Sequence, residues 1–351
     1  MRYDEGMRGL LGTLWVGLAV ACQQESAPPG YPPPQAYPPP QAYPRQGYPP
    51  QAYPPQPYPR PQAYPPQAYP PPQAYPPRQP SAPAWSPRPP PPPVAPAPAQ
   101  RCAAGRVTVD RPDDRAEHQI KVFYVLPRDG ADEGLDVNGA IARSVSSFDH
   151  WLRGQTGGAG LRFDRCAGVL DIAFVRLAKS DAEVASAGAF VREQIQAGII
   201  AAGFDHPRKL NLAYYGGSSR LSCGGGAWPP KLVGRTAAMY LKGTPPGAPP
   251  CASNPLGASP TQPGYLDFSA LHESLHTLGF VGACAPHHTR AGHTSDDPRD
   301  LMYAGDQPWR PQLLDVGRDD YFGHGRADCP DLARSAFVDP LPPSPLVPAG
   351  W

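Results

Sequence analysis

A short run in the second half of the sequence contains residue types that bind and use a metal ion. His272 and His276 are four residues apart, so on a helix both imidazoles lie on one face and can reach a single ion. Glu273 follows the first histidine and can accept a proton from water beside that ion. Because zinc lowers the pKa of a bound water towards 7, the pattern predicts metal-assisted hydrolysis with Glu273 as the catalytic residue.

The neighbouring residues predict the helix that must position this pattern. Leu271, Leu275 and Leu278 recur on the opposite face and would bury the helix in a core. Gly279 follows and can end the helix, because glycine takes left-handed backbone angles freely. We therefore expect a buried helix here rather than two histidines on a solvated face.

This segment and a later one resemble a known clan of enzymes. The run from His272 to Gly279 has the form His-Glu-x-x-His-x-x-Gly, and residues 300–303 read Asp-Leu-Met-Tyr. Together they resemble the metzincin clan of zinc metalloproteases. The resemblance implies zinc ligation by His272 and His276 and a methionine turn at Met302 beneath the metal. It also implies an α/β (α+β) fold with a twisted mixed sheet, an active-site helix and a small irregular C-terminal subdomain.

The third metal ligand departs from the pattern of the clan. Its usual place, three residues after the glycine, is occupied by Gly282. A ligand must then come from the insertion that follows. The candidates are His287, His288, His293 and Asp296. We expect His293, since its interval before Met302 resembles that of matrix-type metzincins, and His287 is the alternative.

Other residues near this segment have weaker assignments. Four aspartates are possible calcium ligands, although a solvated acidic loop explains them more simply: Asp296, Asp297, Asp300 and Asp306. Tyr303 could offer its phenol to a developing oxyanion. The glycine-rich run 223–228 is interpreted as a turn near an edge strand. The resemblance implies that the edge strand of the sheet pairs with extended substrate. We assign residues 237–241 as this edge strand.

The sequence before the histidines alternates between two periodicities. Apolar runs typical of strands cover 119–126, 169–177, 209–215 and 236–241, whereas helical spacing covers 138–152 and 181–200. This order predicts a sheet layered with helices. We therefore expect one zinc metalloprotease catalytic domain over 101–351.

Residues 1–22 have the features of an export signal. Arg2 and Arg8 precede an apolar run that ends in Ala19-Val-Ala-Cys22. The ending resembles a bacterial lipobox, which implies lipidation of Cys22 and a location at the cell surface or outer membrane. Cleavage by ordinary signal peptidase, with secretion, is the alternative.

Residues 23–100 separate this signal from the catalytic domain. Proline makes up 55 of the 351 residues, about three times its average usage. Repeats such as Gln-Ala-Tyr-Pro-Pro forbid helices and sheet ladders, so we expect a disordered, extended spacer.

Charge and cysteine content limit the function further. Lys and Arg total 31 against 30 Asp and Glu, which excludes a polybasic nucleic-acid binder. We expect a monomer that contacts membrane only through its lipid anchor. Seven cysteines are present, and once Cys22 is set aside, six can form three disulfides in an exported domain.

The sequence thus predicts an exported zinc-dependent endopeptidase that acts on protein or peptide substrates. One alternative is a surface binding or adhesion protein with a structural or inactive metal site. Another is a metal-dependent hydrolase that acts on a non-peptide amide, such as a cell-wall crosslink.

Overall fold

The computed structural model describes Cys102, residues 105–246 and residues 249–348. The expected signal segment, with Cys22, and the expected spacer lie outside these residues. Within the described part of the chain, no helix is long and apolar enough to cross a membrane.

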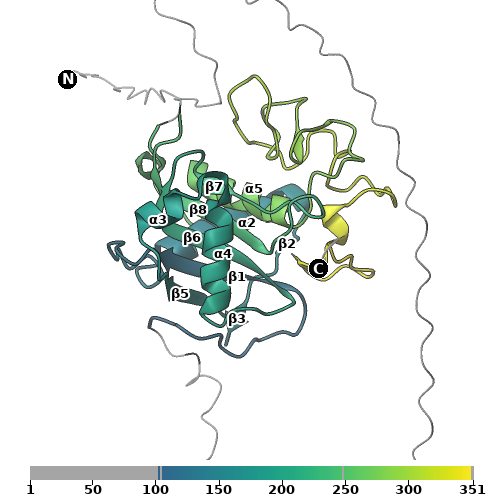
Figure 1. Ribbon diagram of the computed structural model, residues 1–351. Coiled ribbons are helices and arrows are strands. Elements are labelled where there is room, and N and C mark those ends of the chain that lie inside the picture. The colour runs from purple at the N-terminus through teal and green to yellow at the C-terminus, as the bar shows by residue number, and fades with distance from the viewer. Residues whose placement is uncertain (1–101, 103–104, 247–248, 349–351) are drawn as a thin grey trace, which may run out of the picture. The chain divides into compact units, whose positions relative to one another are not determined.

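Helices and short strands alternate along the first two thirds of this region, and irregular chain dominates the last third (Figure 1). The helices are α2 (Ala140–Thr156), α3 (Asp181–Ala185), α4 (Val191–Ala201) and α5 (Tyr265–Thr277), with 3-10 turns η1 (Gly188–Phe190), η2 (Cys251–Ser253) and η3 (Leu332–Arg334). The strands are β1 (Gln119–Leu126), β2 (Gly160–Leu161), β3 (Arg165–Cys166), β4 (Val169–Leu170), β5 (Ile172–Arg176), β6 (Lys209–Ser219), β7 (Gly224–Gly225), β8 (Thr236–Gly243), β9 (His288–Thr289), β10 (His293–Thr294) and β11 (Val338–Asp339).

A mixed five-stranded sheet forms the centre of the fold. Its strand order is β5-β1-β6-β8-β7. The first four strands are parallel, with Val122 opposite Ile172 and Tyr124 opposite Tyr214, whereas β7 runs antiparallel to β8. All eight residues of β1 are buried, as expected for an apolar strand covered on both faces.

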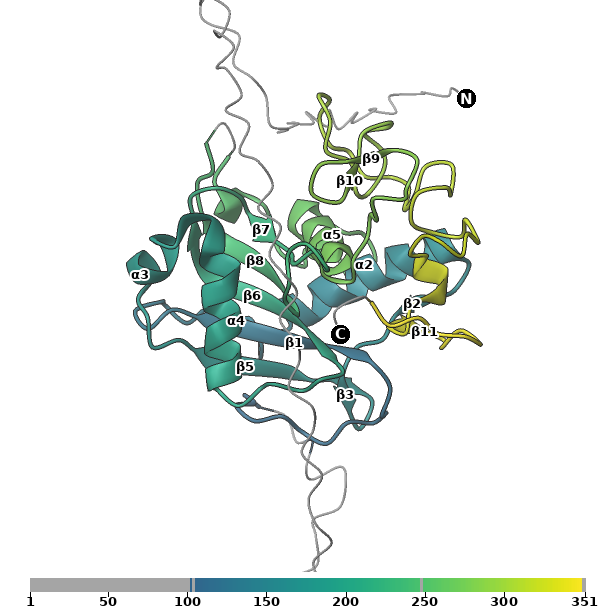
Figure 2. The same cartoon turned by 45° about the vertical axis from the view of Figure 1, so that its right-hand side comes forward.

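Helices cover both faces of this sheet. In the two views, α4 lies against one face, and α2 and α5 lie on the other (Figures 1 and 2). Ile195 and Ile199 of α4 pack into one apolar core with Phe123. Leu271 and Leu275 of α5 belong to the second core. The site helix is therefore fixed by the sheet beneath it.

Several predicted elements are confirmed, and three need correction. The strand over 119–126 forms as predicted, and the helix expected over 138–152 spans Ala140–Thr156 instead. The helix expected over 181–200 is divided into α3, η1 and α4, because Gly188 takes a φ of 60°. The assignment of 237–241 to the sheet edge is wrong: β8 pairs on both sides, and β7 is the edge strand.

Three disulfides link distant parts of the described chain. They join Cys102 to Cys166, Cys223 to Cys251, and Cys284 to Cys329. The expected use of six cysteines in three disulfides is confirmed, and such a set indicates an oxidising environment.

Candidate metal centre

Three histidine side chains converge beside α5, two from the helix and one from the loop that follows it. The Nε2 atom of His272 lies 3.0 Å from that of His276 and 3.3 Å from that of His293. His276 Nε2 and His293 Nε2 are 3.1 Å apart. Two nitrogens bound to one tetrahedral zinc ion at normal bond lengths would be roughly 3.3 Å apart. The spacing therefore suits one metal ion held by three imidazoles.

The other ring nitrogen of each histidine faces a main-chain carbonyl. His272 Nδ1 lies 2.7 Å from the oxygen of Leu301, and His276 Nδ1 lies 3.2 Å from that of Phe280. His293 Nδ1 lies 3.1 Å from the oxygen of Arg290. Each Nδ1 must carry a proton to donate to its carbonyl. The three Nε2 atoms are then unprotonated, and their lone pairs face one another. Such a group of nitrogen ligands is suited to bind a cation.

Burial keeps these imidazoles neutral. Desolvation, assisted by the neighbouring His293, lowers the pKa of His272 to about 3. Desolvation also lowers the pKa of His276 and that of His293. Neutral imidazole is the form that binds metal, so the three rings are ready as ligands throughout the physiological pH range.

Glu273 lies beside this cluster under the edge of the sheet. Its carboxylate accepts a hydrogen bond from the main-chain N–H of Gly226, and desolvation raises its pKa to about 8. A cation at the histidines would lower that pKa by Coulomb attraction. The carboxylate is thus positioned to exchange protons near neutral pH.

Glycines of β7 and the following residue allow this close approach. A Cβ atom on Gly224 would lie 2.7 Å from Glu273 Oε1. One on Gly226 would lie 2.6 Å from the carbonyl oxygen of Glu273 and 2.8 Å from His276 Cβ. The sequence-based interpretation of 223–228 as a turn near an edge strand missed that two residues of this run, Gly224 and Gly225, form the edge strand β7 itself. Two-residue glycine strands leave no period-2 pattern to detect.

The segment expected to form the methionine turn lies against α5. Met302 is fully buried in the same core as Leu271 and Leu275. The carbonyl of Met302 accepts the main-chain N–H of Thr294, next to His293, over 2.9 Å. The hydroxyl of Tyr303 does not point to the histidines. It accepts the main-chain N–H of Gln307 at 3.0 Å.

Trp309 is a site residue that the sequence did not indicate. Its ring meets that of His272 edge-to-face, with centroids 5.7 Å apart. Its Nε1 donates to the carbonyl oxygens of Asp300 and Leu301 at 3.2 and 3.1 Å. The same Leu301 oxygen receives His272 Nδ1, so Trp309 helps to fix the orientation of that ligand.

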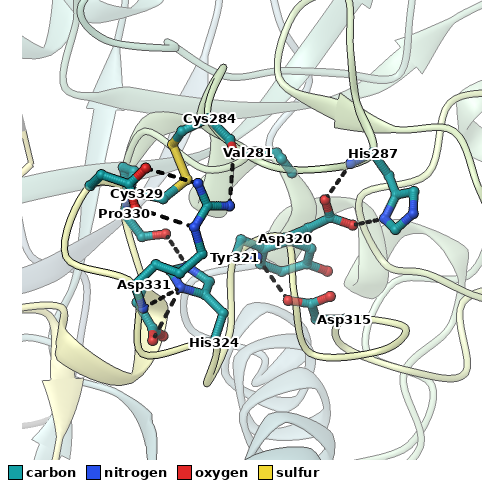
Figure 3. Close-up of a disulfide and its surroundings, with 12 residues drawn as sticks. Val281, Cys284, His287, Asp315, Asp320, Tyr321, His324, Cys329, Pro330 and Asp331 are labelled. Atoms are coloured by element: carbon teal, nitrogen blue, oxygen red, sulfur yellow. Dashed lines mark hydrogen bonds and ion pairs between the residues drawn. A yellow bond between two sulfur atoms is a disulfide. The ribbon is translucent and has the colours of Figure 1, made fainter.

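The loop that brings His293 into the cluster is held from two sides. Trp228 donates from Nε1 to the carbonyl of Val281 over 3.2 Å. Its ring also packs against Gly292, where a Cβ would lie 2.3 Å from Nε1. On the other side, the Cys284–Cys329 disulfide ties the loop to the C-terminal segment (Figure 3).

His287 and His288, the other candidates for the third ligand, point elsewhere. His287 Nδ1 lies 3.0 Å from Asp320 Oδ2 (Figure 3), and Asp320 raises the pKa of His287. His288 stacks on Trp228 with centroids 5.6 Å apart. Asp296 lies 3.8 Å from His287 Nδ1 rather than at the three histidines.

The four aspartates considered as possible calcium ligands do not form a group of ligand atoms in the described part of the chain. Asp297 pairs with Arg299, and Asp300 accepts hydrogen bonds from Met302 N and Tyr321 Oη. A different group, His287 with Asp319 and Asp320, has ligand atoms close enough for an ion. The acidic residues that could hold an ion therefore differ from the four considered from the sequence, and of those four Asp300 is buried rather than solvated.

The chain matches no protein-family model, and a search of curated proteins finds no match.

Proposed function

We propose that this chain is a zinc-dependent endopeptidase of metzincin type. The observation that carries the proposal is the convergence of three unprotonated Nε2 atoms, with Nε2 separations of 3.0 to 3.3 Å, on and next to the helix α5 that also carries Glu273. Three neutral nitrogens leave one tetrahedral position open, which is the arrangement of a catalytic rather than a structural zinc site.

His272, His276 and His293 would hold the ion. When bound, zinc supplies Lewis acidity that polarises the scissile carbonyl and acidifies water. Glu273 accepts the proton of the attacking water at its carboxylate and later donates it to the leaving amine. Trp309 and the carbonyls of Leu301, Phe280 and Arg290 keep the imidazoles oriented meanwhile.

The edge of the sheet supports a peptide as substrate. The outer side of β7 pairs with no strand of the described chain, and Gly224 and Gly226 adjoin Glu273. An extended peptide that pairs with β7 would pass the carboxylate. This arrangement favours a polypeptide over a compact non-peptide amide.

The test combines metal content and hydrolysis of casein on one preparation of the full chain, beside Glu273→Gln. We expect about one zinc per chain in both proteins and a loss of roughly 10²-fold to 10⁴-fold in activity for the variant. Zinc without activity in either protein would favour the binding or adhesion alternative. Absence of zinc would remove the basis of the proposal.

A further inference from the structure

We propose that the arginine-lined cavity beside β2, β3 and β11 binds a phosphate-type oxyanion. The cavity has a volume of about 250 Å³. Its charged lining consists of Arg115, Arg153, Arg162, Arg165, Asp114 and Asp339. Four guanidinium groups against two carboxylates leave an excess of two positive charges in the lining, and Asp149, which lies outside the lining, offsets the charge of Arg153. In Figure 2, β3 lies at the opposite end of the molecule from β9 and β10, which carry the metal loop.

The proposal depends most on the burial of Arg162. Its side chain is 3% exposed, yet no carboxylate of the described residues lies within ion-pair distance of it. Its hydrogen bonds go to main-chain carbonyls, those of His118 at 3.2 Å and Ala336 at 2.9 Å among them. Its Nε is buried without a partner. A buried cation usually has an anionic partner, whereas the carboxylates of Glu117 and Asp339 act on this one only from beyond ion-pair distance.

The two aspartates in the lining neutralise the arginines only in part. Asp114 uses both carboxylate oxygens to accept the main-chain N–H groups of Ala167 and Gly168, at 2.7 and 2.6 Å. Asp339 approaches Arg115 and Arg153 only at 3.4 and 3.7 Å. The carboxylate of Asp114 is thus bound to main-chain N–H groups, and that of Asp339 makes only long ion pairs with the arginines.

The remaining arginines are accessible to a ligand. Arg115 has a side-chain exposure of 56%. Arg153 is 36% exposed and is paired with Asp149 at 2.9 Å. Arg165 is exposed, and its side chain donates to the carbonyl of Gly168 at 3.0 Å. Guanidinium groups match the geometry of phosphate oxygens. A tetrahedral oxyanion would add the missing negative charge.

The oxyanion can come from free phosphate or from a phospholipid headgroup, and the test separates these sources. The full chain carries Cys22→Ser, so that no lipid is attached at this position. Inorganic phosphate is titrated by calorimetry at constant ionic strength. In parallel, the protein is sedimented with vesicles of phosphatidylglycerol and phosphatidylcholine at 3:7, and with pure phosphatidylcholine vesicles.

The variant is Arg115→Gln/Arg165→Gln, since both side chains are exposed and their replacement spares the fold. The control is Arg220→Gln, an exposed arginine outside the cavity. Both proteins keep the three histidines, so phosphate bound at a metal ion would be equal in the two. We expect the double variant to weaken phosphate binding about tenfold or more and the control to leave it unchanged.

If sedimentation with anionic vesicles shows the same dependence on Arg115 and Arg165, the headgroup is the source. If only the binding of inorganic phosphate depends on Arg115 and Arg165, the ligand is a free oxyanion. Binding of neither probe to the unsubstituted protein would overturn the proposal. So would equal binding by the double variant and the control, because the arginines would then serve only to stabilise the fold.

Discussion

The carbonyl partners of the three histidines decide which ring nitrogen is left for a metal. Leu301, Phe280 and Arg290 each accept from Nδ1, and these three carbonyls come from separate turns of the chain. The ligand geometry is therefore set by main-chain positions as well as by the histidines themselves.

His293→Ala should abolish tight zinc binding, because only two neutral imidazoles would remain. We expect a loss of zinc affinity of at least about 10²-fold by competition with a chromogenic chelator. His287→Ala is the matched control from the same loop, and its zinc affinity should stay within about threefold. Equal losses in the two variants would show that His293 is not a ligand.

Gly226→Ala should reduce hydrolysis and stability together. The new methyl group would meet the carbonyl oxygen of Glu273 and the Cβ of His276 at 2.6 and 2.8 Å, and neither atom can move without shifting α5. We expect a destabilisation of about 1–3 kcal/mol in urea unfolding.

Gly154→Ala is the control for this substitution. Gly154 lies within α2, and a Cβ there meets nothing within 4 Å. Its replacement should raise stability by up to about 1 kcal/mol. A Gly226→Ala protein as stable and active as the wild type would contradict the close packing of β7 on Glu273.

At the scale of elements, the Cys284–Cys329 disulfide links the histidine-bearing loop to the C-terminal segment. Replacement of both cysteines by Ala should lower the free energy of unfolding by about 4 kcal/mol, since the loop closed is 45 residues long. Zinc affinity should fall as well, because the loop that carries His293 loses a tether.

The Cys102–Cys166 disulfide provides the comparison. It closes a loop of 64 residues, so its removal should cost a similar free energy of unfolding, about 4 kcal/mol. It does not touch the histidine loop, and zinc affinity should be retained. Equal zinc affinities in the two double variants would show that Cys284–Cys329 does not position His293.

The contact between His287 and Asp320 adds a pH dependence to the same loop. Asp320 raises the pKa of His287 above its unfolded value, so this stabilisation is complete below about pH 6.5. It is lost as the pH rises through the folded-state pKa. Compared with His287→Gln, the wild type should therefore lose stability between pH 6 and pH 9 in urea titrations. His150→Gln, at an exposed position on α2, should leave the wild-type profile unchanged.

The sequence predicted those parts of the fold and site that depend on local spacing. Leu271, Leu275 and Leu278 are buried as expected, and Gly279 takes a φ of 89° after the helix. The edge strand β7 could not be predicted, because Gly224 and Gly225 have low strand propensity and pair only through tertiary structure. Trp309 and the carbonyl of Arg290 reach the histidines through loop conformations that no periodicity encodes.

At the scale of the whole molecule, a buried ion network holds the chain before β1 against the sheet. Lys121 contacts Asp164 at 3.0 Å and Asp110 at 2.9 Å, and it also contacts Asp171. Lys209 contacts Asp110 at 2.8 Å and Asp164 at 2.9 Å. The strap over 107–115 is thus bound to strands β1 and β6 by charge as well as by packing.

Lys121→Met should destabilise the fold by about 3–5 kcal/mol, because it leaves the buried carboxylates of Asp164 and Asp171 short of a cation. Lys242→Met removes an exposed pairing with Glu133 at 3.5 Å and should change stability by less than about 1 kcal/mol. Guanidinium chloride unfolding of both variants checks this, and equal effects would contradict a buried network.

The Cys102–Cys166 bond also determines how the folded region responds to a mechanical load. Cys102 is the first described residue, and its partner lies in β3, beyond the strap and β1 in sequence. A pulling force applied to the amino-terminal segment therefore passes through a covalent bond directly into β3. The ion pairs of the strap carry none of that tension, so the strap does not peel away before the sheet itself is loaded.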